Sequence, residues 1–240
     1  MSEPAGCYSG ARACGGRVWH AERHTQRLAR DARLLGLGEV DTARVLALLD
    51  ALALPTRDGP DAKLRVEAQP DALLGIRLSG TSSPIGAEAP TWRCVAAAVV
   101  HPGASPVSSA KGSDRSLFEA AFSAAHEAGV DEALLFDAAD RLVEGTRSNL
   151  IVVRGDGAVV TPSLACGAQA GIARGILLEH VPLLREAEVS RAELAAAREV
   201  LAINAVRGVR PVIAFDGRPV GDGKPGPWAA RLDHAFRRDC

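Results

Sequence analysis

Apolar side chains recur at helical spacing near the start of the chain. Within residues 22–35, Leu28, Ala32 and Leu35 fall on one face, as in a helix that buries one side. Arg27 lies off this face. The pattern therefore predicts a helix here, with the guanidinium of Arg27 exposed on its surface.

A second helix is predicted between Asp41, a favourable N-cap, and Pro55, which ends it. The pattern then changes to short apolar runs, which predict strands at 63–68, 73–79 and 91–100. The stretch 79–84 is rich in Gly, Ser and Pro, so we expect a loop there.

The stretch Pro102-Gly103-Ala104-Ser105-Pro106 is the best candidate for a linker between two halves. We expect a smaller α+β domain at 1–103 and a larger α/β domain at 104–240, which gives an α+β fold class. The second half predicts helices at 113–128, 172–181, 190–197 and from Trp228, and strands at 132–136, 148–153, 157–160, 199–203 and 209–215. The strands at 148–153 and 157–160 form a predicted hairpin.

Composition narrows the function classes. The 240 residues are 47% hydrophobic and 24% charged, with a formal net charge of −1, so the chain lacks the basic field that attracts nucleic acid or an anionic membrane. No segment reaches about 18 consecutive apolar residues and the N-terminus does not resemble a signal peptide, so we expect a cytoplasmic protein. The five cysteines are scattered without a CxxC pair, which predicts neither a disulfide framework nor a metal site.

Lysine is scarce in this chain. Only Lys63, Lys111 and Lys224 are lysines among 28 cationic residues. Arginine carries surface charge equally well but cannot form an imine, so each lysine is a separate candidate for amine chemistry. Lys111 stands just before a predicted helix, where an exposed loop lysine is the ordinary interpretation.

Three other features could carry chemistry. Glu144 lies in the stretch 143–149, where a surface or ion-paired carboxylate is the ordinary interpretation. Gly171 precedes a predicted helix whose free N–H groups suit a phosphate, although the same pattern is often a turn. Arg27 is the third, and each feature alone is weak.

Together these features occur in the order and at the separations of a known family. The chain resembles the fold-type IV, or class IV aminotransferase-like, pyridoxal-phosphate enzymes, and the 33-residue step from Lys111 to Glu144 is similar to that of the aminodeoxychorismate lyase branch. The resemblance covers residues 8–212 and is carried by Tyr8–Arg12, His24–Leu28, Lys111, Glu144–Asn149, Thr161-Pro162, Gly171–Arg174 and Pro211-Val212.

The resemblance implies a fold, an assembly and a cofactor. It implies a two-domain architecture like that of D-amino-acid aminotransferase, a homodimer, and pyridoxal 5′-phosphate as cofactor. Few residues precede Tyr8, so a shortened N-terminal domain is expected.

The resemblance also implies residue roles. Lys111 would be the catalytic residue, holding the cofactor covalently and moving protons, and Glu144 would keep the ring nitrogen protonated. The implied cofactor-binding residues are Arg27, Lys111, Glu144, Asn149, Gly171, Ile172, Ala173, Asn204 and Ala205. The candidates for substrate binding are Tyr8, Arg12, Arg147, Arg207 and Arg210.

The residues favour two different branches of the family. The stretch 204–212 resembles the lyase, and Ala173 and Ala205 stand where aminotransferases usually have threonine, whereas Gly10 resembles the branched-chain aminotransferases. The preferred reaction converts 4-amino-4-deoxychorismate to 4-aminobenzoate and pyruvate. The alternatives are an aminotransferase for branched-chain or D-amino acids and a non-catalytic cofactor-binding homologue.

Overall fold

The computed structural model describes residues 6–73, 75–87 and 89–238, which form two compact units. Unit 1 contains the described residues up to 87 together with 110–114, and unit 2 contains 89–109 and 115–238. These units differ from the predicted division at residues 103 and 104. The strand at 92–100 packs within unit 2, because it pairs with strands of the second half, whereas the segment around Lys111 packs within unit 1.

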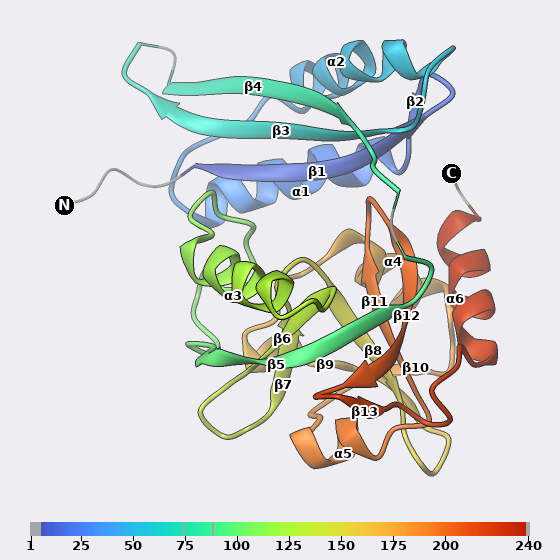
Figure 1. Ribbon diagram of the computed structural model, residues 1–240. Coiled ribbons are helices and arrows are strands. Elements are labelled where there is room, and N and C mark those ends of the chain that lie inside the picture. Colours follow the sequence, from blue (N-terminus) through green and yellow to red (C-terminus); the bar gives the residue numbers. More distant parts are fainter. Residues whose placement is uncertain (1–5, 74, 88, 239–240) are drawn as a thin grey trace. The chain divides into compact units, whose positions relative to one another are not determined.

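Unit 1 is a four-stranded antiparallel sheet, in the order β2-β1-β3-β4, with two helices (Figure 1). Its elements are β1 (Cys7–Cys14), β2 (Arg17–Val18), α1 (Ala21–Leu34), α2 (Thr42–Ala53), η1 (Leu54–Thr56), β3 (Ala62–Asp71) and β4 (Gly75–Pro84).

Buried residues alternate with exposed or partly exposed ones along β1 and over Ala62–Gln69 of β3, which gives this sheet one apolar face. Leu64 and Val66 on that face pack with Leu28 of α1 and Leu49 of α2 in one core. The predicted Asp41 cap is confirmed, since its carboxylate accepts hydrogen bonds from two backbone N–H groups in the first turn of α2.

Two expectations for unit 1 were wrong or incomplete. The stretch 79–84 is not a loop, because it pairs with β3 along its whole length as the second part of β4. Gly80 packs against α2, where a Cβ would lie 2.6 Å from Leu52 Cδ1, so this glycine serves close packing rather than a turn. The strand β1 was not predicted.

Unit 2 contains a nine-stranded mixed sheet in the order β10-β9-β8-β11-β12-β5-β6-β7, with β13 paired to β12. Its elements are β5 (Trp92–Val100), α3 (Ser116–Glu127), β6 (Glu132–Phe136), β7 (Leu142–Gly145), β8 (Asn149–Val153), β9 (Val159–Pro162), η2 (Leu164–Cys166), α4 (Ile172–His180), β10 (Leu184–Ala187), α5 (Arg191–Ala195), β11 (Glu199–Asn204), β12 (Gly208–Phe215), β13 (Arg218–Pro219) and α6 (Pro227–Arg237).

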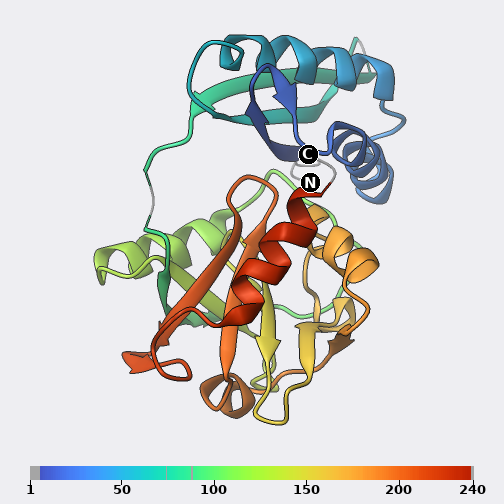
Figure 2. The same cartoon turned by 90° about the vertical axis from the view of Figure 1, so that its right-hand side faces the viewer.

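The strands β6 and β8 of unit 2 are buried along their whole length and carry nearly continuous apolar runs. The observed bounds of β6 match the predicted strand, and the predicted hairpin is confirmed by the antiparallel pairing of β8 with β9. The short strands β7 and β10 were not predicted. Figure 2 shows α6 alongside the sheet, where it packs on β12 and α4.

No helix formed by the described residues is long and apolar enough to cross a membrane.

Candidate active site

Lys111 is held in unit 1 through its backbone. Its N–H donates to Asp31 Oδ2 of α1 at 2.9 Å, and its carbonyl accepts from the N–H of Tyr8 at 3.0 Å. Gly112 and Cys7 form an antiparallel bridge, and the N–H of Ser113 donates to the carbonyl of Gly6 at 2.7 Å. The segment 110–114 therefore runs beside the start of β1 with a defined position for the lysine.

The amine of Lys111 lies over the ring of Tyr8, with Nζ 4.9 Å from the ring centroid. The guanidinium carbon of Arg65 lies 3.6 Å from the same centroid. Arg65 on β3 is the register partner of Gly10, which has no side chain, so the arginine has room to reach diagonally over Tyr8. Arg65 was not among the predicted site residues, although an arginine opposite Gly10 is visible once the register is known.

Arg27 is buried, with 7% of its surface exposed, so the expectation of an exposed guanidinium was wrong. Its Nη2 donates to Ser9 Oγ at 2.8 Å, and Ser9 Oγ lies 2.7 Å from Nδ1 of the buried His24. Burial lowers the pKa of Arg27 to about 10 despite the opposing effect of Asp31, and burial also lowers the pKa of His24 well below 6.5.

The polar group around Arg27 fits an anion. Among the described residues its Nε has no hydrogen-bond partner although it is buried. An incompletely paired buried cation is costly and is relieved by an anion that accepts from it. A phosphate supplies such oxygens.

Glu144 lies on β7 in unit 2, with 5% of its surface exposed. Its Oε2 accepts from the N–H of Gln169 at 3.2 Å and lies 3.5 Å from Nδ2 of Asn149. Asn149 Nδ2 also donates to the Gln169 carbonyl at 3.0 Å. The structure thus brings the predicted residues Glu144 and Asn149 together through Gln169, and it supplies a buried carboxylate of fixed orientation.

A second buried carboxylate, Glu132 of β6, holds the turn that joins β7 to β8. It accepts hydrogen bonds from the hydroxyls of Thr146 and Ser148 and is fully buried. Burial raises the pKa of Glu132, partly offset by these donors and by Arg147. The turn fixes the strands that carry Glu144 and Asn149, so Glu132 supports the site without being one of its expected residues.

His101 also faces Glu144 within unit 2. Its Nε2 lies 4.0 Å from Glu144 Oε1, and its Nδ1 accepts from the N–H of Gly103 at 3.0 Å. Burial lowers the pKa of His101, partly offset by Asp137. A neutral ring whose Nδ1 accepts must carry its proton on Nε2, the nitrogen that lies 4.0 Å from the carboxylate. Nothing in the local sequence indicates this pairing.

The N-terminus of α4 is formed by the predicted residues Gly171, Ile172 and Ala173. Gly171 has an extended backbone, and no side chain of the described residues caps the helix. The first N–H groups of a helix need acceptors and favour an anion. A Cβ on Gly171 would lie 2.0 Å from Asn149 Oδ1, so only glycine fits here.

The structure gives Asn204 a role in the β11–β12 turn. Its Oδ1 accepts from the N–H groups of Val206 and Arg207 at 3.0 and 2.7 Å, and its Nδ2 donates to the carbonyl of Arg147 at 3.3 Å. Ala205 is buried in this turn. Arg210 is half-buried and its Nη1 donates to the neighbouring carbonyl of Val209.

Two candidate substrate residues already have strong partners within their own units. Arg12 pairs with Asp61 and lies over the ring of Trp19. Arg147 lies over the ring of Phe122, 3.8 Å from its centroid, and donates to the carbonyl of Asp131 at 2.9 Å. Both arginines therefore have structural contacts, as Arg65 also has with Glu67, whose Oε1 lies 3.4 Å from Arg65 Nη2.

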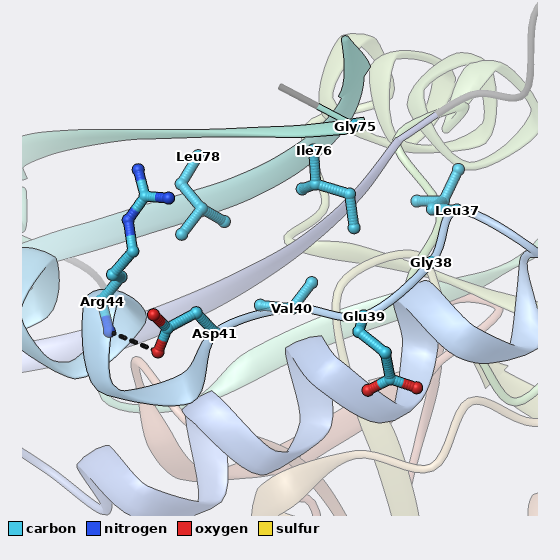
Figure 3. Close-up of a pocket in the computed structure, with 9 residues that line it drawn as sticks. All are labelled: Leu37, Gly38, Glu39, Val40, Asp41, Arg44, Gly75, Ile76 and Leu78. Carbon is cyan, nitrogen blue, oxygen red and sulfur yellow. Dashed lines mark hydrogen bonds between the residues drawn. The ribbon is translucent and has the colours of Figure 1, made fainter. Parts of the chain in front are cut away.

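The cavity in Figure 3 lies in unit 1 and contains none of the predicted site residues. It has a volume of about 200 Å³ and is lined by Leu37, Gly38, Glu39, Val40, Asp41, Arg44, Gly75, Ile76 and Leu78. In the part of the chain that the structure describes, no cluster of His, Cys, Asp and Glu could hold a metal ion.

A family model described as amino-transferase class IV matches residues 6–215. The chain belongs to this family. The match includes Arg27, Lys111, Glu144 and Gly171, which confirms the resemblance inferred from those residues. The family consists of pyridoxal-phosphate-dependent enzymes.

Curated relatives share about a third of the aligned residues. A branched-chain-amino-acid aminotransferase-like protein 2 of Arabidopsis thaliana is 32% identical over 117 residues, which are 47% of this chain and 21% of that protein. The branched-chain-amino-acid aminotransferase of Escherichia coli is 33% identical over 118 residues, which are 48% of this chain and 38% of that protein. The matched part is thus well under half of each relative.

Solved structures of the family share the fold over almost the whole chain. The E. coli branched-chain amino acid aminotransferase has a TM-score of 0.84 at 22% identity, covering 97% of this chain and 84% of that one. A proposed 4-amino-4-deoxychorismate lyase of Legionella pneumophila has a TM-score of 0.86 at 20% identity, covering 99% and 92%. The predicted fold class is confirmed.

Proposed function

We propose that the chain binds pyridoxal phosphate covalently through Lys111 and transfers the amino group of an amino acid. The observation that carries the proposal is the grouping in unit 1, where the amine of Lys111 and the guanidinium of Arg65 lie on one ring, that of Tyr8. An amino-acid substrate needs the amine that holds the cofactor and a cation for its own carboxylate a short distance apart.

The residues of each unit, taken separately, fit groups of this cofactor. Arg27 and the N–H groups of Ile172 and Ala173 would bind the phosphate, and Glu144 would hold a proton on the ring nitrogen. Pyridoxal phosphate supplies an aldehyde that binds amines and a ring that withdraws electrons from the carbon bearing the amine.

Each protein group then has a defined task. Lys111 Nζ would hold the cofactor through its aldehyde carbon, and its amine would then take the proton from the substrate α-carbon and return it to that former aldehyde carbon. Gln169 and Asn149 orient the Glu144 carboxylate through hydrogen bonds. Arg65 binds the substrate carboxylate and so fixes the α-carbon near the lysine.

Branched-chain aminotransferases among the curated relatives favour transamination, and Gly10 agrees with them. A second candidate is the lyase that releases pyruvate from 4-amino-4-deoxychorismate. It is favoured by the stretch 204–212 and by Ala173 and Ala205, which lack the hydroxyls typical of the aminotransferases. Both reactions use Lys111 as the group that moves the proton.

Two substrates separate the candidates. Purified protein loaded with pyridoxal phosphate is incubated with leucine and 2-oxoglutarate, or with 4-amino-4-deoxychorismate and no oxo acid. Glutamate formation in the first mixture supports the aminotransferase, whereas pyruvate release in the second supports the lyase. Loading with cofactor but no turnover of either substrate contradicts both and leaves the cofactor-binding homologue.

The homodimer and the cytoplasmic location stay predictions. Light scattering of the loaded protein tests the assembly, with twice the 25.0 kDa chain mass expected.

A further inference from the structure

Asp31 is a buried carboxylate that the proposed chemistry does not use. It lies on α1 one turn after Arg27, and its side chain is 1% exposed. Burying a carboxylate lowers stability unless the carboxylate is well paired. Its contacts therefore need a structural or functional reason.

Both oxygens of this carboxylate are hydrogen-bonded. Oδ1 accepts from Nε and Nη2 of Arg30 at 2.9 and 2.6 Å, and Oδ2 accepts from the backbone N–H of Lys111 at 2.9 Å. The second contact joins residues 80 positions apart in the sequence. Arg30 neutralises the charge, while the other oxygen fixes the lysine.

We propose that Asp31 is a positioning residue for Lys111, because it ties the backbone of the lysine to the helix that carries Arg27. This role rests on the proposed function, in which Lys111 holds the aldehyde and Arg27 binds the phosphate. The distance between these two groups of one cofactor is fixed, so a shared attachment on α1 keeps the amine and the guanidinium in matching positions.

The position of the segment 110–114 explains why a charged acceptor is needed to hold Lys111. The segment 110–114 has neighbours in sequence on both sides that belong to unit 2, so its place in unit 1 depends on a few hydrogen bonds. A hydrogen bond to a charged acceptor is about twice as strong as one between neutral groups. The Asp31 carboxylate also raises the pKa of Arg27, which favours its charged form.

Amide hydrogen exchange of the ligand-free protein tests the attachment by NMR. Asp31→Ala removes the acceptor, and we expect the Lys111 amide to exchange about tenfold faster or more. Asp31→Asn keeps an oxygen acceptor without the charge, so a smaller increase is expected. Asp50→Asn, an exposed aspartate on α2, is the control and should leave the Lys111 amide unchanged.

The amide of Val66 in β3 reports general destabilisation. Equal acceleration of Val66 and Lys111 in Asp31→Ala would overturn the proposal, as would an unchanged Lys111 amide. If both variants fail to fold, NMR of the wild type can still detect the hydrogen bond. We expect a scalar coupling between the Lys111 amide nitrogen and the Asp31 carboxyl carbon. Its absence also counts against the proposal.

Cofactor affinity is the second readout. We expect Asp31→Ala to bind pyridoxal phosphate about tenfold more weakly or worse, with Asp50→Asn equal to wild type. A wild type that binds no cofactor but protects the Lys111 amide through Asp31 would refute the proposed function and leave the attachment intact. Normal affinity in Asp31→Ala would refute the positioning role and leave the proposed function intact.

Discussion

The two units hold their candidate residues in different ways. In unit 1, Lys111 reaches its place on a five-residue segment held by backbone hydrogen bonds and Asp31. In unit 2, Glu144 and Asn149 lie on the consecutive strands β7 and β8, which one turn joins, and share Gln169 as partner. Unit 1 thus holds an amine and guanidinium groups, whereas unit 2 holds a buried carboxylate and the N–H groups at the start of α4.

Because of this difference, we expect substitutions in the two units to affect activity for different reasons. Substitution of the partly exposed Lys111 or Arg65 in unit 1 should remove a reacting or charged group and leave the fold intact. Substitutions in unit 2 disturb a buried network, so they act through the geometry of several groups together.

The largest expected effect comes from the amine of unit 1. Lys111→Ala should lower turnover at least about a thousandfold, because both covalent attachment and proton transfer depend on it. Steady-state rates measure the loss. The exposed Lys224→Ala is the control, with an unchanged rate and an unchanged melting temperature expected. Near-normal turnover in Lys111→Ala would show that Lys111 is not the catalytic residue.

The next largest effect tests whether the packing of Gly171 against Asn149 matters for cofactor binding. In Gly171→Ala the new Cβ would lie 2.0 Å from Asn149 Oδ1, so the asparagine must move and Glu144 loses a partner. We expect affinity for pyridoxal phosphate to fall about tenfold to a hundredfold, measured by equilibrium dialysis.

Gly175→Ala is the matched control on the same helix, because a Cβ at Gly175 meets no atom within 4 Å. It should keep the affinity and raise the unfolding free energy by about 0.5–1 kcal/mol. Equal affinity in both variants would show that the α4 N-terminus takes no part in binding.

A smaller effect concerns the substrate carboxylate. Arg65→Met removes the guanidinium over Tyr8, and we expect KM for the amino acid to rise about tenfold with a smaller change in kcat. Arg77→Met, on the exposed edge strand β4, should change neither constant. A rise in KM from Arg12→Met instead of Arg65→Met would move carboxylate binding to the position that the sequence suggested.

The smallest effect compares one buried histidine from each unit. His24 and His101 have pKa values lowered by burial, so the unfolded chain binds protons first as the pH falls below about 6.5, and stability is lost there. His24→Asn and His101→Asn keep an acceptor at the Nδ1 position. Each should flatten the fall in unfolding free energy between about pH 7.5 and about pH 5.5 by up to about 1 kcal/mol per group, more for His24. Urea titrations at the two pH values measure it, and an unchanged slope in both variants would contradict the neutral assignments.

Local patterns predicted much of the fold. Helical spacing located α1, the Asp41 cap located the start of α2, and continuous apolar runs located β6 and the β8–β9 hairpin. The strands β1 and β7 were missed because small residues interrupt β1 and because β7 is only four residues long. The polar composition of 79–84 suggested a loop. This prediction failed because β4 is an edge strand, and edge strands can expose polar side chains on both faces.

Local patterns could not predict the supports of the site. Arg27 is buried because it joins Ser9 and His24, and apolar periodicity carries no information about such a network. Asp31 accepts a hydrogen bond from Lys111, which lies 80 positions away in the sequence. His101, directly after β5, lies close to Glu144 of β7. Contacts of this kind depend on the tertiary fold, so the family resemblance supplied the main residues and the structure added their supporting partners.

The central claim is that Lys111 is the covalent anchor for pyridoxal phosphate. The most direct measurement is reduction of the loaded protein with borohydride, followed by proteolysis and mass spectrometry of the three lysine-containing regions. The account predicts the phosphopyridoxyl mass on Lys111 and not on Lys63 or Lys224. Modification spread over the other lysines, or no modification in a protein saturated with cofactor, would contradict it.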